Sequence, residues 1–261
     1  MIHDPRAPRA PGPPRVTIFP NDRAAARALA QHVADALAAR PSLVLGLPTG
    51  RTPVRLYHDL ASLAEHGRAD FSRVTTFNLD EFWGLPARHA ASYRSFMHAH
   101  LFDRVKLRPE QINFLNGTSP NPVEECARYE RAIAAAGGID LQILGLGSNG
   151  HIGFNEPATA LQARTHRVTL KPETRRANSA LFGGDASAVP AEALSMGMAT
   201  ILQARSIVLL VTGRSKAGCV ASMLRGPITP ELPASFLQLH HDVEVVLDQA
   251  AAASLTEPGG G

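Results

Sequence analysis

The strongest constraint on the fold is a regular alternation of short aliphatic runs with helix-like segments. Nearly continuous aliphatic runs lie at residues 43–47, 139–144 and 206–212, and shorter ones at 16–19, 74–77 and 243–247. Helix-like segments fall between them, at 22–39, after Thr52, at 91–103, 121–136, 190–204 and 214–225. Strands that are apolar on both faces are typical of a parallel sheet covered by helices on each side. The sequence therefore predicts an α/β fold with a mostly parallel central sheet.

The two ends of the chain differ in composition from this alternating region. Residues 1–15 are rich in proline and arginine and lack an apolar run, so we expect a disordered arm and no signal peptide. Residues 251–261 end in three glycines and are expected to be a flexible tail. Between these ends, residues 16–250 are predicted to form a single α/β domain, since no internal repeat interrupts them.

Charge and cysteine usage narrow the function classes. The net charge is only +3 and the basic residues are scattered, which argues against a nucleic-acid partner or a membrane patch. No apolar run approaches membrane-spanning length. The two cysteines, Cys126 and Cys219, stand alone without a Cys/His cluster, which indicates reduced thiols, no metal site and a cytoplasmic location.

Ligands of open α/β sheets bind at the carboxyl ends of the strands, and the first such segment is typical of an anion site. In the segment 46–53, Thr49, Gly50 and Thr52 follow a strand and precede a helix. Exposed N–H groups at such a junction favour a phosphate. The alternative interpretation is an ordinary strand–helix joint in which Thr52 is the N-cap, and the segment alone does not decide between them.

Two further strand ends carry side chains that transfer protons. Asp80 and Glu81 are adjacent carboxylates after the strand at 74–77, and either could be a general base or part of a solvated acidic turn. The third strand end, residues 145–157, holds four glycines around His151, with Glu156 five residues later. This setting favours a functional histidine over one that only packs in a turn.

The fourth strand end adds a cation. Lys216 is predicted in the first turn of a helix, where a positive charge opposes the helix dipole, so either it binds an anion or it is an exposed lysine. Together the four segments provide an anion site, a carboxylate base, a histidine and a lysine on one edge of the sheet. This combination fits proton transfer on a small phosphorylated carbonyl compound.

Three motifs resemble the glucosamine-6-phosphate deaminase family. They are Leu45–Pro53, Asn78–Leu85 and, most specifically, Leu144–Pro157 with the string Asn-Gly-His-Ile-Gly-Phe-Asn-Glu-Pro, and the likeness covers roughly residues 16–250. The resemblance implies a Rossmann-like three-layer α/β/α fold, no cofactor, and release of fructose-6-phosphate and ammonium from a sugar phosphate.

The resemblance also implies residue roles. Asp80 would move a proton from C2 to C1 of the open-chain sugar, and His151 would open the ring, held by Glu156 and Asn149. Glu81 would lie nearby as a further carboxylate of the substrate site. The phosphate would be bound by Thr49, Gly50, Thr52 and Lys216.

The chain departs from the family pattern at two places. Ala180 replaces an arginine that reaches the phosphate, so Arg51, Arg175 or Arg176 is expected to substitute for it. His166 and Val168 replace basic residues that bind an activator in hexameric members. We therefore expect the non-allosteric branch, a monomer or small homo-oligomer, and no activation by N-acetylglucosamine-6-phosphate.

Three other functions compete with this prediction. A 6-phosphogluconolactonase would use the same fold and Gly-His loop to release an acid. A galactosamine-6-phosphate deaminase would differ only in the orientation of one sugar hydroxyl. A sugar-phosphate sensor would bind without turnover, although it would not need Asp80, His151 and Glu156 together.

Overall fold

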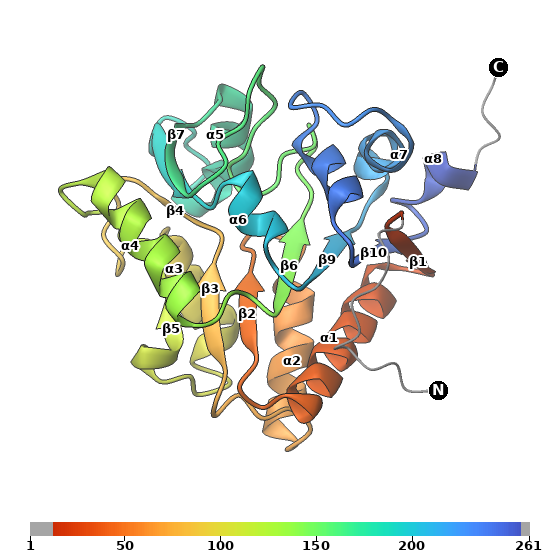
Figure 1. Ribbon diagram of the computed structural model, residues 1–261, viewed down its shortest axis with the longest axis horizontal. Helices are drawn as coiled ribbons and strands as arrows, with labels where there is room; N and C mark the ends of the chain where they lie inside the picture. The colour runs from red at the N-terminus through yellow and green to blue at the C-terminus, as the bar shows by residue number, and fades with distance from the viewer. Residues whose placement is uncertain (1–12, 257–261) are drawn as a thin grey trace.

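The computed structural model describes residues 13–256, and a seven-stranded sheet runs through its centre (Figure 1). We call this the scaffold sheet; its strand order is β1-β10-β9-β6-β2-β3-β5, and all neighbouring strands are parallel. The strands are β1 (Arg15–Phe19), β2 (Val44–Leu47), β3 (Thr75–Asn78), β5 (Ile112–Asn113), β6 (Leu141–Gly145), β9 (Ser206–Val211) and β10 (Val243–Asp248). The prediction of a mostly parallel central sheet is confirmed.

Helices cover both faces of the scaffold sheet. One face carries α1 (Asp22–Ala39), α2 (Val54–Glu65), α3 (Tyr93–Met97) and the π-helical η1 (His98–Phe102); the other carries α4 (Pro122–Ala135), α6 (Met198–Leu202) and α7 (Ala217–Arg225). Within β9, Val208 and Leu210 face the first core, whereas Ile207, Leu209 and Val211 face the second. Because strand side chains alternate between faces, a strand buried on both sides must be aliphatic throughout. The three-layer α/β/α prediction is confirmed.

A second, antiparallel sheet differs from the prediction. This small sheet has the order β4-β8-β7, with β4 at Asp80–Phe82, β7 at His166–Thr169 and β8 at Glu192–Ser195. Figure 1 shows β4 and β7, with α5 (Pro172–Asn178), beyond the carboxyl ends of β3 and β6. The helix predicted over 190–204 is wrong in its first part, because residues 192–195 pair with strands on both sides. Pairing with two neighbours outweighs the helical propensity of this alanine-containing segment.

The ends of the domain also differ from the expected bounds. Residues 1–12 of the predicted arm and 257–261 of the predicted tail lie outside the described residues. Ala251 and Ala252 are buried, and α8 (Ala253–Thr256) contacts α7, so residues 251–256 belong to the fold. Short 3₁₀ segments complete the structure: η2 (Pro109–Gln111), η3 (Ser179–Phe182), η4 (Arg214–Lys216) and η5 (Pro233–Leu239). Within residues 13–256, no helix is both long and apolar enough to cross a membrane.

Candidate active site

The strand order brings the four predicted strand-end segments together. From β2 the sheet grows through β3 to β5 on one side, and from β6 it grows through β9 to β10 on the other. A reversal of this kind opens a crevice beyond the carboxyl ends of the two central strands. The segments that begin at residues 48, 79, 146 and 212 follow β2, β3, β6 and β9, which are consecutive neighbours. They therefore lie together at the carboxyl ends of the central strands of the scaffold sheet.

Asp80 begins β4 immediately beyond β3, and its side chain has the properties of a general base. The residue is only 5% exposed, and its Oδ1 has no hydrogen-bond partner in the described part of the chain. Such unpaired buried oxygens are uncommon in folded proteins. Burial, reinforced by the charge of Glu81, raises the pKa of Asp80 to about 8. Proton transfer is most efficient when the pKa of the base lies near the working pH.

Glu81, although adjacent, is engaged in a different way. Its Oε1 accepts hydrogen bonds from the backbone N–H groups of Phe82 (2.9 Å) and Tyr93 (3.0 Å), and its Oε2 accepts one from Arg94 (3.0 Å). Burial raises the pKa of Glu81 to about 7, and these three N–H groups oppose that shift. The carboxylate thus fastens the start of α3 to β4. This geometry fits a carboxylate that lies near the substrate site and positions it, and a contact of Glu81 with the substrate stays a prediction.

His151 is held by Asn149. Its Nδ1–H donates to Asn149 Oδ1 at 2.7 Å, which leaves Nε2 as the proton acceptor of the ring. Burial and then the positive charge of Lys216 lower the pKa of His151 to about 4. The imidazole is therefore neutral at pH 7, and Lys216 lies close enough for its charge to act on the ring.

Glu156 does not form the predicted contact with His151. Its Oε1 accepts from the backbone N–H of Lys171 at 3.3 Å, while Oε2 is buried without a partner among the described residues. The adjacent Asn155 donates to the Ile152 and Met196 carbonyls at 2.9 and 2.8 Å, which fixes this end of the loop. Glu156 is thereby left with one buried oxygen that a ligand could use.

Two glycines allow this loop to approach the site. A Cβ on Gly147 would lie 2.2 Å from His151 Nδ1, so the imidazole packs directly on the backbone there. Gly153 has φ +56°, and a Cβ on it would lie 3.1 Å from Ser195 Oγ and 3.5 Å from Asp80 Oδ2. The glycine-rich loop therefore lies against the Asp80 carboxylate, which joins the second and third predicted segments into one site.

Sequence reasoning missed the tyrosines that surround Asp80. The chain has three, Tyr57, Tyr93 and Tyr129; burial raises the pKa of each phenol, and the charge of Asp80 adds to that rise. Tyr57 donates to the Pro48 carbonyl and Tyr129 to the Asn78 carbonyl (2.7 Å), whereas Tyr93 donates to Asn178 Oδ1 (2.8 Å) in α5. The scarcity of tyrosine was the one available signal, but the convergence of three helices on one carboxylate cannot be read from spacing.

The predicted phosphate residues lie on two neighbouring turns. Gly50 has φ +101°, and burial raises the pKa of the Tyr93 phenol while the nearby Thr49 side chain lowers it. The alternative role of Thr52 as N-cap is not formed, since Pro53 holds that position without a side-chain cap. Lys216, in η4, is half-buried, and its side-chain ammonium has no hydrogen bond or ion pair with another described residue.

Two of the three arginines expected to substitute at Ala180 are occupied. Arg175 donates to the Val189 and Ser187 carbonyls at 3.0 and 2.9 Å. Arg176 forms an ion pair with Glu173 at 2.9 Å. Arg51 is exposed, and its guanidinium forms no hydrogen bond or ion pair with the described part of the chain.

Comparison with known proteins agrees with the resemblance that the motifs carry. Residues 22–247 match the family described as glucosamine-6-phosphate isomerases/6-phosphogluconolactonase. The chain belongs to this family. It is 47% identical to glucosamine-6-phosphate deaminase 2 of Bacillus subtilis over 85% of this chain and 90% of that protein. It is also 47% identical to the glucosamine-6-phosphate deaminase of Hahella chejuensis, with 92% of each covered.

Solved structures of two members of the glucosamine-6-phosphate isomerase/6-phosphogluconolactonase family share the fold of this chain. A monomeric glucosamine-6-phosphate deaminase superposes with a TM-score of 0.88 at 40% identity, covering 92% of this chain and 99% of that one. A 6-phosphogluconolactonase from Trypanosoma cruzi superposes with a TM-score of 0.76 at 19% identity, covering 95% and 99%. The second likeness shows the shared fold alone.

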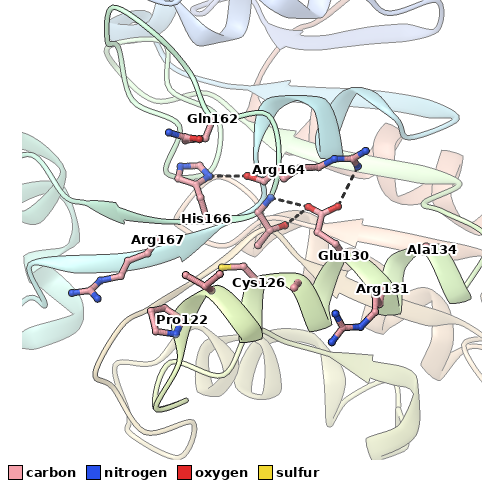
Figure 2. Close-up of a pocket in the computed structure, with 12 residues that line it drawn as sticks. Pro122, Cys126, Glu130, Arg131, Ala134, Gln162, Arg164, His166 and Arg167 are labelled. Carbon is pink, nitrogen blue, oxygen red and sulfur yellow. Dashed lines mark hydrogen bonds and ion pairs between the residues drawn. The ribbon is translucent and has the colours of Figure 1, made fainter.

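A groove of about 810 Å³ lies apart from these residues, between α4 and the segment 162–167 (Figure 2). Glu130 anchors that segment: it accepts from the Thr165 backbone N–H at 2.7 Å and forms an ion pair with Arg164 at 3.4 Å. None of the nine predicted site residues lines the groove. In residues 13–256, no group of three His, Cys, Asp or Glu side chains could hold a metal ion.

Proposed function

We propose that this chain converts glucosamine-6-phosphate and water to fructose-6-phosphate and ammonium. The observation that carries the proposal is the Asp80 carboxylate, which is buried, has an unpaired oxygen and lies against the loop that bears His151. The reaction needs one base that works near neutral pH and one group that moves a proton between sugar oxygens. Relatives that carry this activity in their names share 42–47% of their residues with most of the chain.

Ring opening comes first, because the C2 proton becomes acidic only beside a free aldehyde. The Nδ1–H bond to Asn149 leaves Nε2 of His151 as an acceptor, and the low pKa keeps the ring neutral. Nε2 takes the proton of the anomeric hydroxyl as the C1–ring oxygen bond breaks, and returns it to the ring oxygen. This transfer changes no net charge, so a neutral imidazole suffices. Glu156 offers its unpaired oxygen to a sugar hydroxyl.

Isomerisation and deamination follow at C2. Asp80 takes the C2 proton and delivers it to C1, and a second proton passes from the C2 nitrogen to O1, so the C2 amine becomes an imine and the aldehyde becomes a primary alcohol. Water then adds to the imine, and loss of ammonia leaves the C2 ketone of fructose-6-phosphate. Thr49, Gly50, Thr52 and Lys216 hold the phosphate, and no metal or cofactor takes part. We further propose a monomer or small homo-oligomer in the cytoplasm that N-acetylglucosamine-6-phosphate does not activate.

Ammonium release is the direct test. Purified protein without added metal is mixed with glucosamine-6-phosphate, and ammonium and fructose-6-phosphate are measured in the same sample, with galactosamine-6-phosphate in parallel. Equal amounts of both products from the gluco sugar are expected. Faster release from the galacto sugar would reassign the epimer. Acid release from 6-phosphogluconolactone, without ammonium from either amino sugar, would contradict the proposal.

A further inference from the structure

The turn between β2 and α2 carries a cation without a partner. Arg51 is exposed, and its guanidinium makes no hydrogen bond or ion pair with another described residue. Arg55, one helical turn further on, is paired with Asp22 at 2.8 Å. A long cationic side chain left unpaired at the rim of a binding crevice is available to an anionic ligand.

A second unpaired cation lies beside it. β2 and β9 are separated only by β6, so the turns that follow them share one edge of the sheet. Lys216, at the end of the second turn, is half-buried and unpaired. Burial lowers the pKa of Lys216, the Cys219 thiol opposes that shift, and the positive charge of Arg51 adds to it. Two like charges that act on each other without an acidic partner favour binding of an anion between them.

The backbone of the turn that carries Arg51 also favours an anion. None of the N–H groups of residues 49–52 donates a hydrogen bond to another group in the described part of the chain. Gly50 has φ +101°, a left-handed conformation that helps to form an anion-binding concavity of successive N–H groups. The turn also leads into α2, a helix of 12 residues whose positive end faces the same edge.

We propose that Arg51 binds the substrate phosphate and, together with Lys216, clamps it over the turn 48–53. The identity of the sugar phosphate rests on the proposed function, whereas the clamp itself requires only a phosphate group. The guanidinium presents two parallel N–H groups to phosphate oxygens, and Lys216 acts as a point charge. Arg51 is thus a specificity residue that separates phosphorylated from unphosphorylated sugars.

The test compares Arg51→Gln with Arg73→Gln. Arg73 is likewise exposed and lies just before β3, at the amino ends of the strands, so its loss removes an equal charge far from the clamp. KM and kcat are measured with glucosamine-6-phosphate, and the Kd values of fructose-6-phosphate and inorganic phosphate by calorimetry. In Arg51→Gln we expect KM and both Kd values to rise about 10- to 100-fold, as for loss of a charged hydrogen bond. We expect kcat to stay within about twofold, and any residual turnover of unphosphorylated glucosamine to be unchanged.

Several outcomes would overturn the clamp. Unchanged KM and Kd values in Arg51→Gln would mean that Arg51 is a surface residue that does not bind the phosphate. If Arg214→Gln raises KM and Kd more than Arg51→Gln does, the phosphate is bound by Arg214, the exposed arginine that begins η4, and the proposed pair of Arg51 and Lys216 is wrong. Failure of the unmodified protein to bind any phosphate compound would also overturn the clamp. If it binds fructose-6-phosphate without releasing ammonium from the amino sugar, the proposed reaction fails, but the Kd comparison still decides the role of Arg51.

Discussion

The scaffold sheet and the small sheet follow opposite rules of construction. In the scaffold sheet, β9 is an unbroken aliphatic run, and residues such as Leu209 and Val245 are completely buried and paired in register. The small sheet instead carries Asp80 opposite Ser195, and Ser195 opposite His166, in strands of three or four residues. The scaffold thus supplies hydrophobic stability, while the small sheet keeps a carboxylate in a place that disfavours its charge. Mutations in the two sheets should therefore separate stability from activity.

Asp80→Asn should give the largest effect, a loss of turnover of about 100- to 10,000-fold with ligand binding retained. An amide cannot accept the C2 proton, although it fills the same space. In the unmodified protein, kcat/KM should rise with pH as Asp80 ionises near its pKa of about 8. Both are read from initial rates of ammonium release between pH 6 and pH 9. Normal turnover in this variant would remove Asp80 from the mechanism.

The same variant should be more stable than the parent at alkaline pH. The folded pKa of Asp80 is raised, so the folded state holds a proton that the unfolded state has lost, and stability falls between about pH 4 and pH 8. Asp80→Asn removes this loss, and the gain at pH 8, on the order of a few kcal/mol, should vanish near pH 4. Urea unfolding at both pH values measures it. Equal stability at pH 8 would mean that the carboxylate is not strained by burial.

The contrast between the sheets also explains what could be predicted from sequence. Apolar runs identified six of the seven scaffold strands to within about two residues, because strands buried on both faces are largely apolar, whereas the two-residue β5 (Ile112–Asn113) was not predicted. β8 has no such run: its pairing with β4 and β7 depends on partners 23 to 115 residues away, so the sequence predicts a helix there instead of a strand. Side-chain contacts could not be predicted for the same reason, because they depend on residues that are distant in the sequence. Asp80 and Glu81 are equivalent in sequence, and only the position of α3 decides which carboxylate is occupied.

Leu209→Ala should show the opposite pattern to Asp80→Asn. Leu209 is fully buried in β9 between β6 and β10, and truncation of such a leucine costs about 2–5 kcal/mol through lost contacts and the cavity left behind. Because the side chain touches no reacting group, kcat per folded molecule should stay within about twofold. Urea unfolding and ammonium release check the two halves. A large fall in kcat without a loss of stability would show that the scaffold tunes the chemistry directly.

Tyr93→Phe should give the smallest effect, and it tests the contact between the two regions. The Tyr93 hydroxyl donates to Asn178 Oδ1 in α5 at 2.8 Å and lies near the Thr49 side chain, so it connects the phosphate turn with the segment beyond it. Its loss should cost about 1 kcal/mol of stability and raise KM by a few fold. Tyr129→Phe is the matched control: within residues 13–256 its hydroxyl bonds only to the backbone carbonyls of Asn78 and Asn113, so a similar loss of stability should leave KM unchanged. Equal KM values in the two variants would mean that Tyr93 only packs, and that the phosphate turn is held by the scaffold sheet alone.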